Sequence, residues 1–479
     1  MKIKKLSIAT LSIMLMASGL TACGGSDSSS SSTGNATNPP VNTSLSEIEQ
    51  AKEIVRTAKL FLTDADSVQK TYESASDLMT DKQQDRLSDA VDIPAIIHDY
   101  MRKHNLTTLT AAQLQDLTKR DTTSFENLYS YLGQISLVPS SDFQISRTAD
   151  DQFTMQGKLT ATKDIYDYVR VNNRYTYQQV DKDIYEVVYK GYNRIQNSST
   201  IQGNFGFDSI TIGSGAELVN LTANQTAGQF NASFSKNVNY NSEFDIDTVH
   251  MAGTTLNKGE ATIKNIVLTA NGNTVNATEL SASALDISNI VDGQTLIRTV
   301  PYQFKIAGQL KMATPKTDAT FSLNASAKES DIKNMLVIDA NDEVVEKNGV
   351  TLPITALVSI KGQATGENNK TIPLDFQATL NRKANKIVSL DNLVATVEGK
   401  TLYALGTSNF DANNELLNSE VTFKQNKATI TVKFDKNNDA ISTNGKIADI
   451  LVNGKDYGDL MQNGSMITAK FTDNDLITL

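Results

Sequence analysis

Residue types that commonly carry out catalysis are sparse in this chain, and their spacing forms no complete catalytic pattern. The chain holds three histidines, His98, His104 and His250, and a single cysteine, Cys23. Neither a His-Glu-x-x-His motif, nor a Gly-x-Ser-x-Gly motif, nor a glycine-rich phosphate-binding loop occurs in the sequence. Without a second cysteine or clustered histidines, we expect no transition-metal site and no cofactor. The sequence therefore favours a protein that is not an enzyme.

Two short segments keep a hydrolase open as the enzymatic alternative. Ser67-Val-Gln-Lys70 and Ser233-Phe-Ser-Lys236 have the Ser-x-x-Lys spacing in which a lysine can activate a serine nucleophile. Neither segment is accompanied by the Ser-Asp-Asn and Lys-Thr-Gly motifs that complete such a site. A pair of carboxylates could also hydrolyse a glycoside, but the 54 acidic residues leave no pair that stands out.

Tyrosines form the clearest local concentration of one residue type. Seven of the 15 tyrosines lie between residues 166 and 192, and four of them, Tyr166, Tyr168, Tyr175 and Tyr177, flank a predicted hairpin turn. That turn would bring Tyr168 and Tyr175 near each other across two strands. An aromatic surface of this kind could stack on a sugar or anchor a peptide. The favoured alternative is a cross-strand ladder that serves strand propensity and packing.

The N-terminus has the order of residues that directs export. Three lysines within residues 2–5 precede an apolar stretch over residues 6–20, which is too short to be a mature membrane span. The junction Leu20-Thr21-Ala22-Cys23 resembles the lipobox of bacterial lipoproteins. The resemblance implies that residues 1–22 are removed and that Cys23 becomes an acylated N-terminus. A lone cysteine in an exported protein has no disulfide partner, which agrees with lipidation.

Acylation at Cys23 would make the membrane the first partner of the protein. Two or more acyl chains hold a protein stably on a bilayer, whereas one chain holds it only marginally. In the lipoprotein family, an Asp directly after the cysteine favours retention in the inner membrane, and this chain has Gly24 there. The resemblance therefore implies a cell-envelope protein, held on the outer membrane if the source has two membranes.

The charge balance excludes some classes of partner. The chain has 44 basic and 54 acidic residues, a net charge of −10. Removal of the signal peptide takes away three lysines and no acid, so the mature chain would carry about −13. An acidic surface argues against nucleic-acid binding and against docking of the whole body on anionic lipid head groups by charge.

Composition divides the chain into four parts. Residues 1–22 form the signal peptide, and residues 23–43 are rich in Ser, Gly and Pro and are expected to form a disordered tether. Residues 44–134 are predicted to form a small all-helical domain. Residues 135–479 are predicted to form an antiparallel β-rich region, with two subdomains divided near residues 292–315. The predicted fold class is therefore α+β, with a meander, a sandwich or a curved sheet as the larger part.

The helical domain is predicted from apolar residues that recur every three or four positions over residues 48–79. This pattern fits one or two consecutive helices, with a break at residues 63–66. Further helices are predicted over residues 94–104, with Pro94 in the first turn, and over residues 110–132. An internal core between these helices is expected, with a helical partner as the alternative.

After Gly133 the apolar period changes from 3.6 to 2, which indicates antiparallel strands with one wet face. Strict alternation occurs over residues 319–327, 372–380 and 428–434. Turns rich in Asp and Asn separate the apolar runs, because these residues bond to their own backbone and tolerate the left-handed region. These turns lie at residues 339–342, 411–414, 435–438 and 472–475.

Two functions without catalysis remain. The favoured one is a binding or scaffold module held at the membrane, with an envelope protein or a glycan as its partner. The alternative is a carrier or acceptor of apolar molecules such as lipids, because a curved antiparallel sheet can enclose an apolar groove. Small residues on the inner face, Ala325, Ala327 and Ala378, would leave room for such a ligand.

Overall fold

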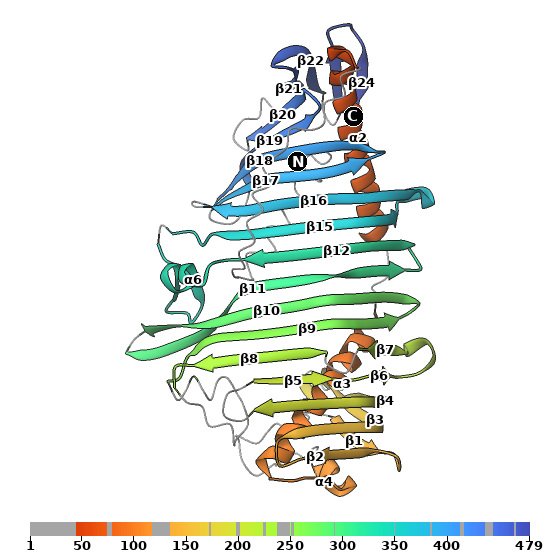
Figure 1. The fold of residues 1–479 in the computed structure, drawn as a ribbon, viewed down its shortest axis with the longest axis vertical. Helices are drawn as coiled ribbons and strands as arrows, with labels where there is room; N and C mark the ends of the chain where they lie inside the picture. The colour runs from red at the N-terminus through yellow and green to blue at the C-terminus, as the bar shows by residue number, and fades with distance from the viewer. Residues whose placement is uncertain are drawn as a thin grey trace. The chain divides into compact units, whose positions relative to one another are not determined.

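The computed structural model of this chain describes most residues from Leu45 onwards. The described residues are 45–73, 79–116, 135–171, 174–197, 202–223, 227–236, 250, 253–291, 293–348, 350–383, 386–411, 416–435, 444–463 and 466–479. A few helices accompany a large antiparallel sheet, which confirms the predicted α+β class (Figure 1). Cys23 and the predicted tether lie outside the described residues.

Two compact units divide the chain. The terminal unit consists of Met1–Ala75 and Ser281–Leu479, and the middle unit consists of Ser76–Leu280. The strand β10 (Asn273–Val291) spans the division. This division differs from the sequence-based one in two ways: it falls before residues 292–315, and it separates the first long helix from the second.

Where the structure describes it, the terminal unit contains the helices α2 and α6, a 3-10 turn and most of the strands. Its elements are α2 (Glu47–Glu73), β11 (Gln294–Met312), β12 (Thr317–Ser326), α6 (Glu329–Met335), β13 (Leu336–Ile338), β14 (Val344–Glu346), β15 (Ile354–Thr365), η4 (Glu367–Asn369), β16 (Thr371–Lys383), β17 (Ile387–Val397), β18 (Lys400–Phe410), β19 (Leu416–Gln425), β20 (Ala428–Asp435), β21 (Asn444–Val452), β22 (Lys455–Asn463), β23 (Met466–Phe471) and β24 (Leu476–Thr478). The strands β13 and β14 form a separate hairpin, and the others pair with their neighbours along the chain as an antiparallel meander.

In the described residues, the middle unit contains the helices α3 and α4, a 3-10 turn and a second set of antiparallel strands. Its elements are α3 (Asp81–Lys103), α4 (Ala111–Asp116), β1 (Ile135–Pro139), β2 (Gln144–Arg147), β3 (Gln152–Val171), β4 (Arg174–Asn197), β5 (Gln202–Gly206), β6 (Ser209–Ile212), η3 (Gly215–Glu217), β7 (Val219–Thr222), β8 (Gly228–Phe234) and β9 (Leu256–Ala270). β1 and β2 both pair with β3, β3 pairs with β4, and β4 pairs with β5 and β6. β7 and β8 then pair with β9.

The helix α2 lies across one face of the sheet in the terminal unit. It contacts β15 and every strand from β17 to β24, as Figure 1 shows for the red-orange helix beside the blue strands. Its buried residues, Ala51, Ile54, Val55 and Ala58, belong to one core with side chains from β12 to β23. The apolar stripe of α2 is therefore buried against a sheet, whereas the sequence predicted a core between helices.

The break predicted at residues 63–66 is wrong, because α2 is continuous through this segment. Contacts on both sides of the segment hold the second half of the helix in register. Phe61 packs against the core before it, and the Ser67 hydroxyl accepts a hydrogen bond of 2.7 Å from the Glu367 backbone N–H after it. Burial and a tertiary hydrogen bond thus outweigh the weak helix propensity of Thr63 and Asp64.

The helix α3 packs on the sheet of the middle unit and contains Pro94 in its interior. The sequence predicts Pro94 in the first turn, but the helix already begins at Asp81. Thr80 is its N-cap and forms a capping box with Gln83. A proline leaves the carbonyl four residues earlier without its helical partner. Here the Tyr189 hydroxyl donates a 2.8 Å hydrogen bond to the Ala90 carbonyl, so the tertiary structure supplies the missing donor.

The strand predictions are confirmed where the structure describes them. The three strictly alternating segments coincide with β12, β16 and β20. The turns at residues 339–342 and 472–475 join β13 to β14 and β23 to β24, with Asp342 and Asn474 in the left-handed region. The other two Asp/Asn turns, and most of the helix predicted over residues 110–132, lie outside the described residues.

Within the described part of the chain, the structure contains no helix that is both long enough and apolar enough to cross a membrane.

Candidate functional site

An apolar surface continues across three neighbouring strands of the terminal unit. The register pairs Ile306 of β11 with Leu323 of β12, and Leu323 with Val358 of β15, so these side chains share one face. One row further along the strands, Phe321 pairs with Ile360 on the same face. We call this surface the apolar strip, and its members are Phe304, Ile306, Leu310, Phe321, Leu323, Val358 and Ile360.

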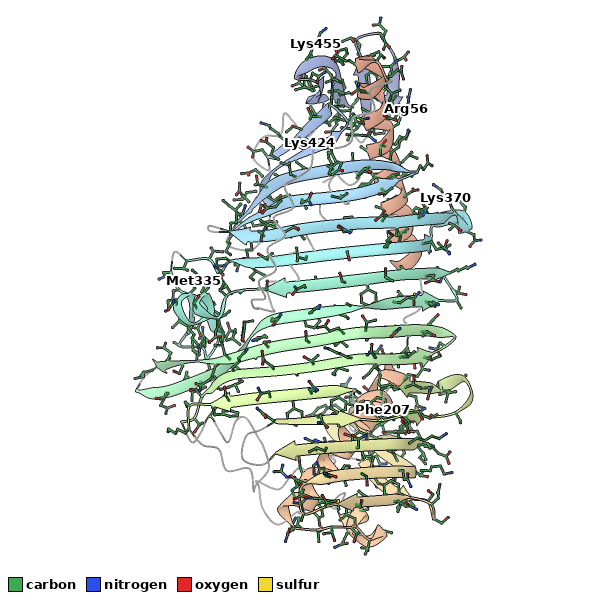
Figure 2. All side chains as sticks on the ribbon, viewed as in Figure 1. Arg56, Phe207, Met335, Lys370, Lys424 and Lys455 are labelled. Atoms are coloured by element: carbon green, nitrogen blue, oxygen red, sulfur yellow. The ribbon has the colours of Figure 1, made fainter. Side chains whose placement is uncertain are left out.

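The apolar strip is half-buried, although the continuation of the same face is fully covered. On β17 and β18, Leu393 is 1% and Leu402 0% exposed, because α2 lies over them. Phe376 of β16 pairs with Ile360 and packs partly against this covered core, so it connects the two regions. None of the strip's members belongs to any of the hydrophobic cores formed by the described residues. Figure 2 draws the side chains of these strands, with Lys370 at the turn between β15 and β16.

The two faces of these strands differ sharply in polarity. Between Phe304 and Leu310 on β11, every residue on the strip's face is apolar or glycine, and the same holds for β12 and β15. The opposite face carries Lys305, Thr320 and Lys361, together with a hydroxyl pair between Ser322 and Ser359 at 2.8 Å. Water satisfies the polar face, whereas the strip would gain free energy if an apolar partner covered it.

The dimensions of the apolar strip suit a hydrocarbon chain. Six residues separate Phe304 from Leu310, which corresponds to roughly 20 Å along the strand, and three strands give a width of roughly 10 Å. An acyl chain in one leaflet of a bilayer spans about 15 Å, half of the hydrocarbon thickness. The strip offers apolar contact without a charge, which is the kind of surface that suits an alkyl chain.

The small residues that led to the groove hypothesis lie beside the strip and not within an opening. Ala325 is 0%, Ala327 5% and Ala378 5% exposed, and α2 or α6 packs over these positions. These alanines lie on the same sheet face as the strip, but the room expected at them is filled. The larger members of the strip could have been found from the alternation itself, because they share the inward positions of β11, β12 and β15.

The four tyrosines singled out in the sequence lie on the hairpin of β3 and β4, as predicted for the turn at residues 171–174. The direct cross-strand partner of Tyr168 is Tyr177. Tyr175 lies directly opposite Arg170 and is therefore the diagonal neighbour of Tyr168. The register puts Tyr166, Tyr168, Tyr175 and Tyr177 at positions of one face of the hairpin. Tyr168 is 65% exposed. The other clustered tyrosines are structural, since Tyr185, Tyr189 and Tyr192 are buried in the core of the middle unit.

The Ser-x-x-Lys segments serve structural contacts. Ser67 accepts the hydrogen bond from Glu367 described above, and Lys70 forms ion pairs with Asp66 at 2.8 Å and with Glu367 at 3.8 Å. Ser233 lies on β8, where its hydroxyl donates to the Lys258 carbonyl at 3.5 Å. Ser67 thus fixes the end of α2 on the turn between β15 and β16.

The histidines do not form a common site. His98 is fully buried, stacks on Phe153 with ring centroids 4.8 Å apart, and places Nε2 3.2 Å from Asp151. Burial lowers the pKa of His98, against the raising effect of Asp151. His104 lies instead beside Tyr100, with ring centroids 4.3 Å apart.

Asp151 is the acceptor at the centre of this buried cluster. Burial by itself raises the pKa of Asp151, but hydrogen bonds from His98 and Arg147 and the charge of Arg102 outweigh it and lower the pKa to about 2. Arg147 Nε lies 2.6 Å and Arg102 Nε 2.7 Å from the carboxylate. A permanently ionised carboxylate held by two guanidinium groups ties α3 to the start of β3.

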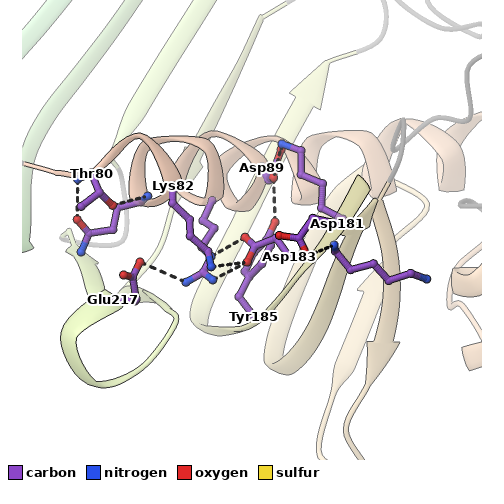
Figure 3. A network of polar contacts seen from close by, with 11 residues as sticks. Thr80, Lys82, Asp89, Asp181, Asp183, Tyr185 and Glu217 are labelled. Atoms are coloured by element: carbon purple, nitrogen blue, oxygen red, sulfur yellow. Dashed lines mark hydrogen bonds and ion pairs between the residues drawn. The ribbon is translucent and has the colours of Figure 1, made fainter. Parts of the chain in front are cut away.

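A second buried ionic network joins α3 to β4 (Figure 3). Arg86 donates two hydrogen bonds to Asp183, of 2.7 Å from Nε and 2.6 Å from Nη2, and Lys82 lies 3.1 Å from the same carboxylate. The hydrogen bonds from Arg86 lower the pKa of Asp183, although burial opposes this. Tyr185 donates to Asp89 at 2.9 Å, and its pKa is raised, chiefly by burial. Every charge has a partner, as expected of a structural clamp.

One cluster of carboxylates could hold a cation by geometry. It consists of Asp449, Asp456 and Asp459 on β21 and β22. The Lys446 ammonium pairs with Asp449 and lies 2.6 Å from Asp459, so a cation of the chain itself already neutralises much of this charge. Asp456 accepts a hydrogen bond from the Gly458 N–H, which explains its position in the turn.

Among the described residues, the apolar strip is a continuous apolar surface that none of the three hydrophobic cores includes. Comparison with known proteins adds no analogue, since no protein-family model, no curated protein and no solved structure matches this chain.

Proposed function

We propose that this chain is a lipid-anchored envelope protein that binds the hydrocarbon part of a lipid on the apolar strip. The observation that carries the proposal is the change of burial along one sheet face. The face is fully buried where α2 lies on β17 and β18 and only partly buried on β11, β12 and β15. The anchor rests on the lipobox-like junction at Cys23.

The energetics favour a ligand with a long alkyl chain. Each methylene group moved from water into an apolar contact contributes roughly 0.8 kcal/mol, so ten such groups contribute roughly 8 kcal/mol before the cost of association. The strip has no charged residue that would orient a polar head group, so the head group should remain in water. This arrangement predicts low selectivity among head groups and strong dependence on chain length.

The test compares two adjacent residues on opposite faces of β12. Phe321→Asp places a carboxylate on the apolar strip, whereas Thr320→Asp places it on the wet face. The protein is purified from its membranes, extracted with organic solvent, and the copurified lipid is quantified by mass spectrometry. We expect the wild type and Thr320→Asp to retain lipid and Phe321→Asp to lose it by more than tenfold, because an unpaired charge opposes apolar contact.

Two results would decide against lipid binding at the strip. Equal lipid in both variants would contradict binding at the strip, and no lipid in the wild type would favour the scaffold function expected from the sequence. A melting curve of each variant shows whether a loss of lipid reflects unfolding, and a fluorescent fatty acid added to the folded variants then measures binding directly. For the anchor, mass spectrometry of the protein itself must show a modified N-terminus at Cys23, and a free thiol would contradict it.

A further inference from the structure

The helix α2 starts on the sheet face that carries the apolar strip. It begins at Glu47, and its buried residues share one core with Ala325 of β12 and Ala356 of β15. Ala325 pairs directly with Phe304 of the strip, so it lies on the strip's face. The start of α2 and the strip both belong to the terminal unit. The first helix therefore begins on the side of the sheet on which the strip is only partly buried.

The helix α2 leads from the last strands of the sheet towards the strands that carry the strip. At its start, the Tyr457 hydroxyl of β22 donates a hydrogen bond to the Glu47 carboxylate. Towards its end, Ser67 accepts the hydrogen bond from Glu367 at the turn between β15 and β16. The helix from Glu47 to Ser67 is roughly 30 Å long. Ile360 of the strip lies roughly 23 Å further along β15, so the path from the start of α2 to the strip is shorter than roughly 60 Å.

The segment before α2 is long enough to bring an acyl chain on Cys23 to the strip. At full extension residues 23–46 would span roughly 80 Å, which exceeds the length of this path. A chain attached through such a segment is an intramolecular ligand, with an effective concentration on the order of 1 mM at the strip. The attached chain also loses less translational freedom on binding than a free lipid does. It is therefore favoured over free lipid as the occupant of the strip.

From this geometry we infer that one acyl chain of Cys23 lies on the apolar strip of the same molecule whenever the anchor is outside a bilayer. The inference rests on the proposed function, because it takes the strip as a site for alkyl chains and identifies the chain that occupies it. In water the strip then shields the hydrocarbon of the anchor. In a bilayer the same chain enters the hydrocarbon region, and the strip becomes open to a lipid. Insertion of the anchor thereby regulates the lipid site.

The test uses the full mature chain, residues 23–479, whose only cysteine allows one alkyl chain to be attached at the sulfur of the anchor. A hexadecyl chain with a diazirine near its methyl end is coupled to Cys23. The protein is irradiated in buffer without detergent, and the crosslinked peptides are identified by mass spectrometry. We expect crosslinks to β11, β12 and β15 of the same molecule. Isotope-labelled protein without the probe, mixed in equal amount, reports crosslinks between molecules, which should be few.

A matched pair of variants changes the reach of the attached chain. Deletion of residues 25–44 leaves four residues before Glu47, which span roughly 14 Å, and should reduce crosslinks to β11 and β12 by more than tenfold. Replacement of the same residues by a Gly/Ser segment of equal length should keep these crosslinks. In the undeleted chain, a fluorescent fatty acid should bind about tenfold more tightly without the hexadecyl chain than with it, because the attached chain competes.

The outcomes separate the inference from the proposed function. Crosslinks scattered over the whole chain, equal in the deletion variant and its control, or formed chiefly between molecules would overturn the inference, while binding of the free fatty acid would still support the proposed function. No binding of the fatty acid to the chain without the hexadecyl group would contradict both. Melting curves show whether the two variants are folded, and the competition measurement does not depend on them.

Discussion

Asp183→Asn should destabilise the middle unit strongly, because it leaves Arg86 buried with only part of its partner charge. The side chains of Arg86 and Asp183 are 6% and 8% exposed and share two short hydrogen bonds. Removing one member of a buried pair costs about 3–5 kcal/mol. Glu217, 3.8 Å from Arg86, retains some compensation, so we expect the lower end, about 3 kcal/mol. For a unit of about 200 residues this corresponds to a fall in melting temperature of about 6–12 °C.

Calorimetry of the full-length protein measures this shift, with the transition of the middle unit assigned by hydrogen exchange of α3. Glu186→Gln is the matched control, since Glu186 lies on the same strand and forms an exposed ion pair with Lys158 at 2.8 Å. The control should move the melting temperature little, because water screens exposed pairs. The double substitution Arg86→Met with Asp183→Leu should recover most of the loss. Equal shifts for Asp183→Asn and Glu186→Gln would refute this reasoning.

Two further predictions concern the cores and the response to pH. Ile54→Ala, at a fully buried position of α2, should lower the stability of the terminal unit by about 2–4 kcal/mol in urea unfolding, whereas the exposed Arg56→Ala should change it by less than about 0.5 kcal/mol. Similar effects of the two substitutions would contradict the placement of α2. Burial lowers the pKa of His98, so the unfolded chain binds a proton near pH 6.5 that the folded chain refuses. The middle unit should therefore lose stability as the pH falls below about 6.5, and in His98→Gln thermal melting should not show this loss.

Local patterns in the sequence predicted the strands, but they did not predict which elements pack against the helices. Alternation over residues 319–327 and 372–380 identified β12, β16 and their apolar face, because the period of two is imposed by the strand itself. The same reasoning could not show that the partner of α2 comes from the distant strands β12 to β24. An apolar stripe records that a helix is buried, but it does not record what buries it.

The errors in the helices have physical causes that lie outside the local sequence. Pro94 fits the first turn of a helix by its own chemistry, and only the hydroxyl of Tyr189, about 100 residues away, makes an interior position acceptable. The buried ionic networks of Arg86 and of Asp151 likewise combine residues from distant segments, so spacing along the chain could not reveal them. For the apolar strip, the alternation predicts the inward positions, but it does not predict where α2, the helix that covers the neighbouring strands, ends.

Photo-crosslinking with a fatty acid that carries a diazirine near its methyl end tests the binding claim most directly. The probe is added to the purified full-length protein, irradiated, and the modified peptides are identified by mass spectrometry. The structure predicts crosslinks to residues of β11, β12 and β15, centred on Ile306, Leu323 and Val358, that decrease when unlabelled fatty acid competes. Crosslinks spread over the opposite polar face, or confined to the middle unit, would contradict a lipid site on the apolar strip.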